Sequence, residues 1–118
     1  MKKIFSLLVI SALGVLGVKA NEQPEYPGGK AAMDKFIAEN LHYPEIAKEN
    51  GVEGIVAVGF IVNVDGSLKN IKVVRFIDPD LEKEAVRVVT IMPAWIPAEK
   101  EGTPIEAPSQ VDIPFLLE

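Results

Sequence analysis

Apolar residues alternate between two spacings along this chain, and the changes of spacing predict both helices and strands. From residue 30 to Pro44 they recur every three or four positions, which predicts a helix with one buried stripe: Met33, Phe36, Ile37 and Leu41. Residues 54–64 are apolar on both faces, as expected of a strand in the centre of a sheet. Asp65-Gly66 then signals a tight turn, and residues 68–76 return as the second strand of a hairpin.

Two further helices are predicted from their end signals. A short one begins at Pro44 and closes at Asn50-Gly51, with two residues facing inward: Ile46 and Ala47. A longer one begins at Asp78-Pro79 and ends at Pro93. Its apolar residues form one inward stripe: Leu81, Ala85, Val88, Val89 and Met92.

The last segment, residues 105–117, alternates as a third strand. Pro108 and Pro114 have no N–H, so this strand is expected at an edge of the sheet. The long helix is a crossover, so the third strand should run parallel to the second and lie beside the first. We therefore expect an α+β fold: a three-stranded antiparallel sheet in the order 2-1-3, with helices on one face.

The first twenty residues predict an export signal. Lys2 and Lys3 precede an uncharged apolar run, and Val18-Lys19-Ala20 places small residues where a signal peptidase reads, so cleavage before Asn21 is expected. An uncleaved membrane anchor is the alternative, although the run of about 15 residues is shorter than the roughly 20 needed to span a bilayer. The predicted organisation is a signal peptide (1–20), an extended lead-in (21–29) and one domain (30–118). Export without disulfides suits a location in the periplasm or at the cell surface.

Charge and cysteine content exclude several function classes. Loss of the signal peptide leaves 9 basic residues against 17 acidic ones, and a net charge near −8 disfavours nucleic acids and anionic lipids. The chain has no cysteine, which excludes disulfides, thiol catalysis and thiolate metal ligands.

No set of residues has the pattern of a catalytic or metal site. His42 is the only histidine, and no second histidine or cysteine is available to join it. Asp78, Asp80 and Glu82 have the spacing of a helix N-terminus and too few oxygen ligands for calcium. We therefore expect a non-catalytic protein without a cofactor or metal.

An ordered set of turn, proline and aromatic residues runs from Tyr43 to Phe115. It comprises Tyr43-Pro44, Gly54, Asp65-Gly66, Trp95 with Pro97, Gly102 with Pro104, and Pro114. This set resembles the C-terminal domain family of TonB, the periplasmic protein that couples inner-membrane energy to outer-membrane transporters. The resemblance implies structural roles for Tyr43, Pro44, Gly54, Asp65, Gly66, Trp95 and Pro97. Trp95 is expected in the core, with a solvent-facing anchor for a partner as the alternative.

The resemblance also implies a binding surface and a partner. In the family, the last strand presents a free edge, to which the TonB box of an outer-membrane transporter adds as a further strand. Carried onto this sequence, the partner-binding residues are Gln110, Val111, Asp112, Ile113, Phe115 and Leu116. The prolines at 108 and 114 interrupt the row of donors, so we expect a short docking stretch.

Two modes of action remain open at this point. Only the nine residues Asn21 to Gly29 precede the first helix, about 30 Å when extended, so we expect a free-standing module of a TonB-type transport system. Alternatively, the same edge supports a structural or assembly role, through homodimers made by edge pairing or strand exchange.

Overall fold

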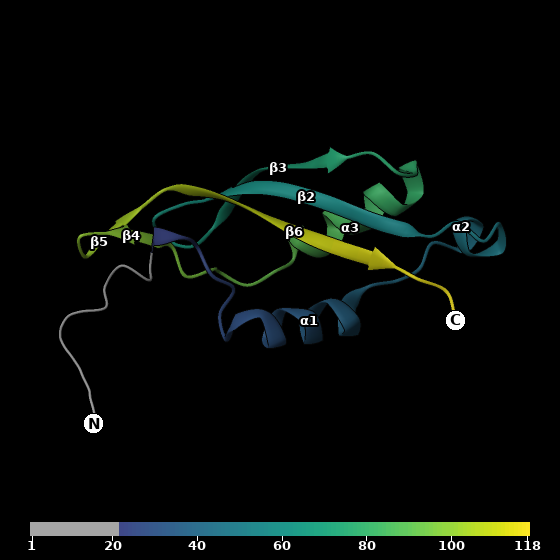
Figure 1. Ribbon diagram of the computed structural model, residues 1–118, viewed down its shortest axis with the longest axis horizontal. Coiled ribbons are helices and arrows are strands. Elements are labelled where there is room, and N and C mark those ends of the chain that lie inside the picture. The colour runs from purple at the N-terminus through teal and green to yellow at the C-terminus, as the bar shows by residue number, and fades with distance from the viewer. Residues whose placement is uncertain (1–21) are drawn as a thin grey trace, which may run out of the picture.

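The computed structural model describes residues 22–118, and the predicted signal peptide lies outside them. The described chain forms a small sheet with helices and a separate short hairpin (Figure 1). The elements in order are α1 (Gly29–Asn40), α2 (Glu45–Glu49), β2 (Gly54–Val62), β3 (Leu68–Arg75), α3 (Pro79–Thr90), β4 (Ala98–Lys100), β5 (Thr103–Ile105) and β6 (Ala107–Phe115).

The sheet has the order β3-β2-β6, with both pairs antiparallel. These are the second, first and third predicted strands, so the order 2-1-3 is confirmed. The crossover helix α3 returns the chain to the far side of β2, as expected of a connection between parallel strands.

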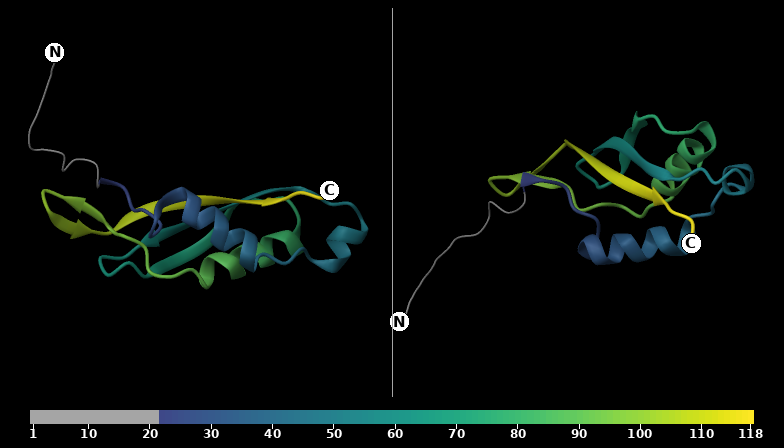
Figure 2. Two further views of the ribbon diagram at one scale, coloured as in Figure 1. Left: turned by 90° about the horizontal axis from the view of Figure 1, so that it is seen from below. Right: turned by 45° about the vertical axis from the view of Figure 1, so that its right-hand side comes forward.

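The core lies between the sheet and α3. One face of β2 is buried against the helix, and it consists of Val56, Val58, Phe60 and Val62. The helix contributes its predicted stripe, with Leu81, Ala85, Val88 and Val89 all fully buried. Figure 2 shows that α1 runs along the β6 side of the sheet, where Ile37 joins the core.

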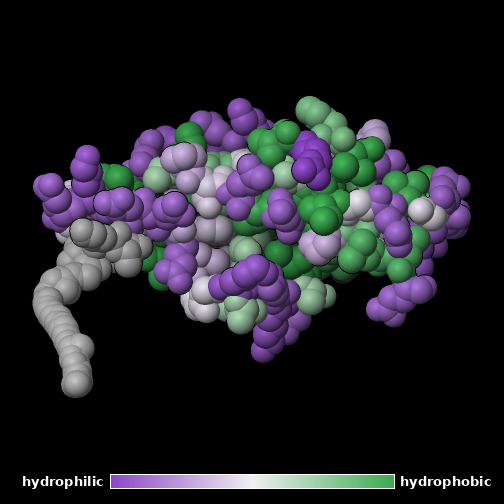
Figure 3. Space-filling model, viewed as in Figure 1, coloured by the Kyte–Doolittle hydropathy of each residue, from purple (hydrophilic) through white to green (hydrophobic). Residues whose placement is uncertain are grey.

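The opposite face of β2 carries no helix in the described chain, as expected of a sheet with helices on one face (Figures 1 and 2). Ile55 on this face is 43% exposed. Figure 3 shows apolar residues among polar ones on this open face. Ile46 is also 63% exposed instead of facing inward, because the five-residue α2 buries only Ala47.

Residues 98–105 form a hairpin that the sequence pattern did not predict. β4 pairs with β5 through a tight turn in which Glu101 and Gly102 both have positive φ, 54° and 82°. The last sheet strand therefore begins at Ala107, two residues later than expected.

The lead-in, expected only to be extended, takes part in the core. Glu25 and Ile96 exchange two backbone hydrogen bonds, of 2.9 and 2.8 Å. The adjacent Tyr26 is only 7% exposed and packs edge-on against Trp95, with 5.8 Å between ring centroids. The lead-in therefore closes one end of the domain.

The turn between β2 and β3 is held against the chain that follows α3. The N–H of Trp95 donates to the carbonyl oxygen of Gly66 at 2.9 Å. Gly66 has φ of 90°, and a Cβ at this position would lie 2.2 Å from the Trp95 carbonyl oxygen. Only glycine fits both the backbone conformation and the space.

Candidate functional site

The free edge of β6 is the longest regular stretch of unpaired backbone in the described chain. Its ladder to β2 runs without a shift from Ala107 to Phe115. Pro108 and Pro114 have no N–H, so they cannot be among the residues that exchange hydrogen bonds with β2 in this unbroken ladder. Because residues alternate in direction along a strand, the free edge is formed by the even-numbered ones: Pro108, Gln110, Asp112 and Pro114.

The identity of these four even-numbered residues determines which hydrogen-bond donors and acceptors the free edge offers. The two prolines offer only carbonyl oxygens, while Gln110 and Asp112 each offer a carbonyl oxygen and an N–H. Within residues 22–118, neither of these N–H groups has a hydrogen-bond partner outside the ladder. The edge therefore presents two central donors among four acceptors, along a nine-residue strand of roughly 30 Å.

The sequence-predicted binding residues divide into two groups. Val111, Ile113 and Phe115 are at most 3% exposed, with side chains in the core and backbone groups turned toward β2. The alternation along the strand directs these three residues away from the free edge. Gln110, Asp112 and Leu116 are exposed.

The other edge of the sheet, on β3, is protected against pairing. The β2–β3 ladder has two register shifts, and Asn70 has a positive φ of 55°. The strand also carries exposed cationic residues: Lys69, Lys72 and Arg75. Irregular backbone and cationic side chains both discourage the addition of another strand, so β6 is the edge suited to pairing.

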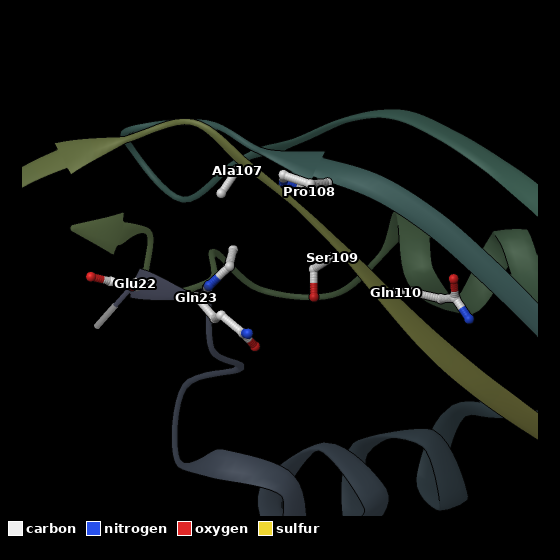
Figure 4. Close-up of a pocket in the computed structure, with 7 residues that line it drawn as sticks. Glu22, Gln23, Ala107, Pro108, Ser109 and Gln110 are labelled. Carbon is white, nitrogen blue, oxygen red and sulfur yellow. The ribbon is translucent and has the colours of Figure 1, made fainter. Parts of the chain in front are cut away.

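Two hollows lie along the β6 edge. The first, of about 560 Å³, separates Glu22–Pro24 of the lead-in from the Ala107–Gln110 half of β6 (Figure 4). The second, of about 410 Å³, lies between α1 and the other half of β6, at Asp112 and Pro114. Backbone on both halves of the strand is therefore open to an incoming segment.

Residues behind β6 hold the strand in place. Tyr43 packs edge-on against Phe115, with 5.6 Å between ring centroids, and its hydroxyl donates to the Val52 carbonyl oxygen. Burial, and secondarily the Glu53 carboxylate, raises the pKa of Tyr43. Pro44 precedes α2 as its N-cap residue.

The remaining residues given structural roles lie at the start and far end of the sheet. Trp95 is 6% exposed and packs on Phe60 at 5.1 Å, which places it in the core and excludes the solvent-facing alternative. Asp65 accepts hydrogen bonds from the Ser67 Oγ and N–H, which lower the pKa of Asp65. Gly54 opens β2 and Pro97 is half-buried before β4.

The acidic residues around α3 accept hydrogen bonds that stabilise this helix and its contacts. The Asp78 carboxylate accepts from the N–H groups of Asp80 and Leu81, at 3.0 and 3.2 Å, as predicted for an N-cap. The backbone N–H of His42 donates to the Glu84 carboxylate at 2.7 Å.

No group of three or more potential metal ligands occurs in the described part of the chain. Between residues 22 and 118, no helix has both the length and the apolar character to cross a bilayer.

Comparison with known proteins decides the family. Residues 39–117 match the family model for the Gram-negative bacterial TonB protein C-terminal domain. This chain belongs to that family. The suspected resemblance is therefore confirmed, and membership is consistent with a protein-interaction module of TonB systems.

The relatives agree with this assignment. The TonB proteins of two Helicobacter pylori strains are each 41% identical over 49 residues, or 42% of this chain. That match spans only 18% and 17% of their own lengths. A solution structure of the H. pylori TonB C-terminal domain is 26% identical with a TM-score of 0.54, covering 72% of this chain and 89% of that one. A second is 24% identical with a TM-score of 0.56, covering 88% and 98%, and supports the fold.

Proposed function

We propose that this protein is a non-catalytic periplasmic module of a TonB-type transport system, which binds an extended peptide by strand addition to β6. The peptide is the N-terminal segment of an outer-membrane transporter, as the family implies. The observation that carries the proposal is the regular β6 edge, with unpaired N–H groups on Gln110 and Asp112 and open space along both halves.

The energetics favour a modest affinity. An added strand has up to six main-chain hydrogen bonds available, each worth about 0.5–1.5 kcal/mol net. Ordering a flexible peptide costs about 2–5 kcal/mol or more, so main-chain bonds alone leave a small surplus. Side-chain contacts must supply the remaining affinity and all of the selectivity.

Homodimerisation through the same edge is the second candidate, and one register favours it. If two β6 strands pair antiparallel about Val111, Gln110 of each copy lies opposite Asp112 of the other. All four edge N–H groups then find carbonyl partners, and no two carboxylates are directly opposed. A dimer of this kind would occupy the proposed peptide site.

An amide-shift titration of residues 22–118 with transporter-derived N-terminal peptides tests the proposal. Saturable shifts centred on Gln110 and Asp112 are expected. No shifts from a protein that tumbles as a monomer would refute peptide binding at this edge. A tumbling time that doubles with protein concentration, with no response to peptide, would favour the dimer.

A further inference from the structure

One face of α1 is turned toward the β6 edge. The residues that line the groove between them recur at helical spacing along α1: Lys30, Asp34, Ile37, Ala38 and Leu41. Asp112 and Pro114 line the other side. Figure 1 shows α1 running alongside β6 over the second half of the strand.

The groove has an apolar floor, and the charges on its α1 side cancel. Ile37, Ala38 and Leu41 supply hydrocarbon, and the volume of about 410 Å³ is ample for one large aliphatic or aromatic side chain. Lys30 and Asp34 pair with each other at 2.8 Å, so their charges largely cancel.

Asp112 carries the uncompensated charge beside this groove. Its side chain is exposed, and among residues 22–118 its carboxylate has neither an ion pair nor a hydrogen bond. Its cross-strand neighbour Ala57 offers no polar group to balance it. A cation on an added strand would find the carboxylate free.

Strand alternation assigns these two features to neighbouring peptide positions. A peptide residue opposite Ile113 points to the same side of the sheet as Ile113, which is the helix side, and so enters the groove. The next peptide residue lies opposite Asp112 and points to the open face, beside the carboxylate. This assignment holds for either direction of the added strand.

We propose that α1 makes this edge selective: it accepts an extended peptide in which a large apolar residue is adjacent to a lysine or arginine. The inference rests on the proposed function and adds the class of peptide to it. The apolar residue supplies most of the discrimination, since burying such a side chain is worth roughly ten- to a hundredfold in affinity. The exposed ion pair with Asp112 adds about twofold to fivefold and weakens with salt.

Four peptides of equal length separate the two contributions. They carry Leu-Lys, Ala-Lys, Leu-Glu or Ala-Glu at the two positions in an otherwise identical threonine- and valine-rich strand, and binding to residues 22–118 is measured by calorimetry. Leu-Lys should bind most tightly and Ala-Glu most weakly. Equal affinities for the four peptides, with changes in amide chemical shift still centred on Gln110, would overturn the selectivity while leaving strand addition intact. Binding by none of the four would overturn both.

Two variants place the selectivity on the groove. Ala38→Phe fills it from an exposed helix position, so the preference for Leu over Ala should disappear while the Ala-Lys peptide still binds. Glu39→Phe adds the same ring at an exposed position that does not line the groove, and it should retain the preference. Asp112→Asn preserves the N–H and should remove only the preference for Lys over Glu. Retained leucine preference in Ala38→Phe would contradict the role of α1.

Discussion

Replacing both edge-facing donors of β6 by proline separates strand addition from strand stability. Pro108 and Pro114 already stand at even-numbered positions of β6, which face the free edge. Proline at Gln110 and Asp112, two further even-numbered positions, therefore removes only N–H groups that the ladder to β2 does not use. We therefore expect Gln110→Pro/Asp112→Pro to fold, with a melting temperature within a few degrees of the parent. Proline at Val111 is the matched control, because the Val111 N–H belongs to the ladder and its loss leaves a buried carbonyl without a partner, at a cost of about 1–3 kcal/mol in the free energy of unfolding.

The expected loss of binding follows from the same geometry. Two hydrogen bonds at about 1 kcal/mol each amount to about 2 kcal/mol, or roughly a thirtyfold weaker Kd, before any clash of the proline rings with the added strand. Calorimetry with a transporter-derived peptide measures the Kd, and thermal unfolding by circular dichroism checks the fold. A folded double variant with parental affinity would show that the edge is not the binding site. An unfolded one would show that the assigned parity of β6 is wrong.

Three further predictions concern the scaffold. Burial would by itself raise the pKa of Glu84, but hydrogen bonds from Arg87 and from a backbone N–H outweigh it and leave this pKa lowered. Glu84 should therefore stabilise the fold by about 1–2 kcal/mol above pH 4.5, and this stabilisation should be lost as the pH falls through its lowered pKa. Thermal unfolding of Glu84→Gln measures it: a difference in melting temperature from the parent that is the same at pH 7 and pH 3 would contradict this role. Gly66→Ala should lower the free energy of unfolding, measured by chemical denaturation, by at least about 2 kcal/mol. Gly51→Ala is the control, because Gly51 has φ of 68° with nothing within 4 Å of its added Cβ, and it should lower this free energy by only about 1 kcal/mol. Equal losses would argue against the close approach at Gly66. Tyr26→Ala should cost about 2–4 kcal/mol in the same assay because it empties a buried aromatic site, and a cost below 1 kcal/mol would mean that the lead-in is not part of the core.

The sheet could be predicted from the sequence because its signals are local. The Asp65-Gly66 turn defines the hairpin, and the crossover helix leaves one place for the third strand. The helix stripe facing the core follows directly from its 3.6-residue period. Each of these depends on residues close together in the chain.

The missed features depend on contacts between distant segments. Tyr26 lies in a proline- and glycine-rich stretch with no periodicity, and its burial depends on Trp95, nearly seventy positions later. The β4–β5 hairpin has strands of three residues, too short for alternation to be visible.

The candidate site was only partly readable. Pro108 and Pro114 share one parity, and that signal, together with an edge position, could have separated Gln110 and Asp112 from Val111 and Ile113. The groove could not be predicted, because the position of α1 beside β6 is set by packing across the whole domain.

Amide hydrogen exchange along β6, with and without a transporter-derived peptide, tests the central claim most directly. The N–H groups of Val111 and Ile113 should be protected in both states, because they bond to β2. Those of Gln110 and Asp112 should exchange rapidly in the unbound monomer and become protected at saturating peptide. Rapid exchange at Gln110 and Asp112 when the peptide is fully bound would contradict strand addition to this edge.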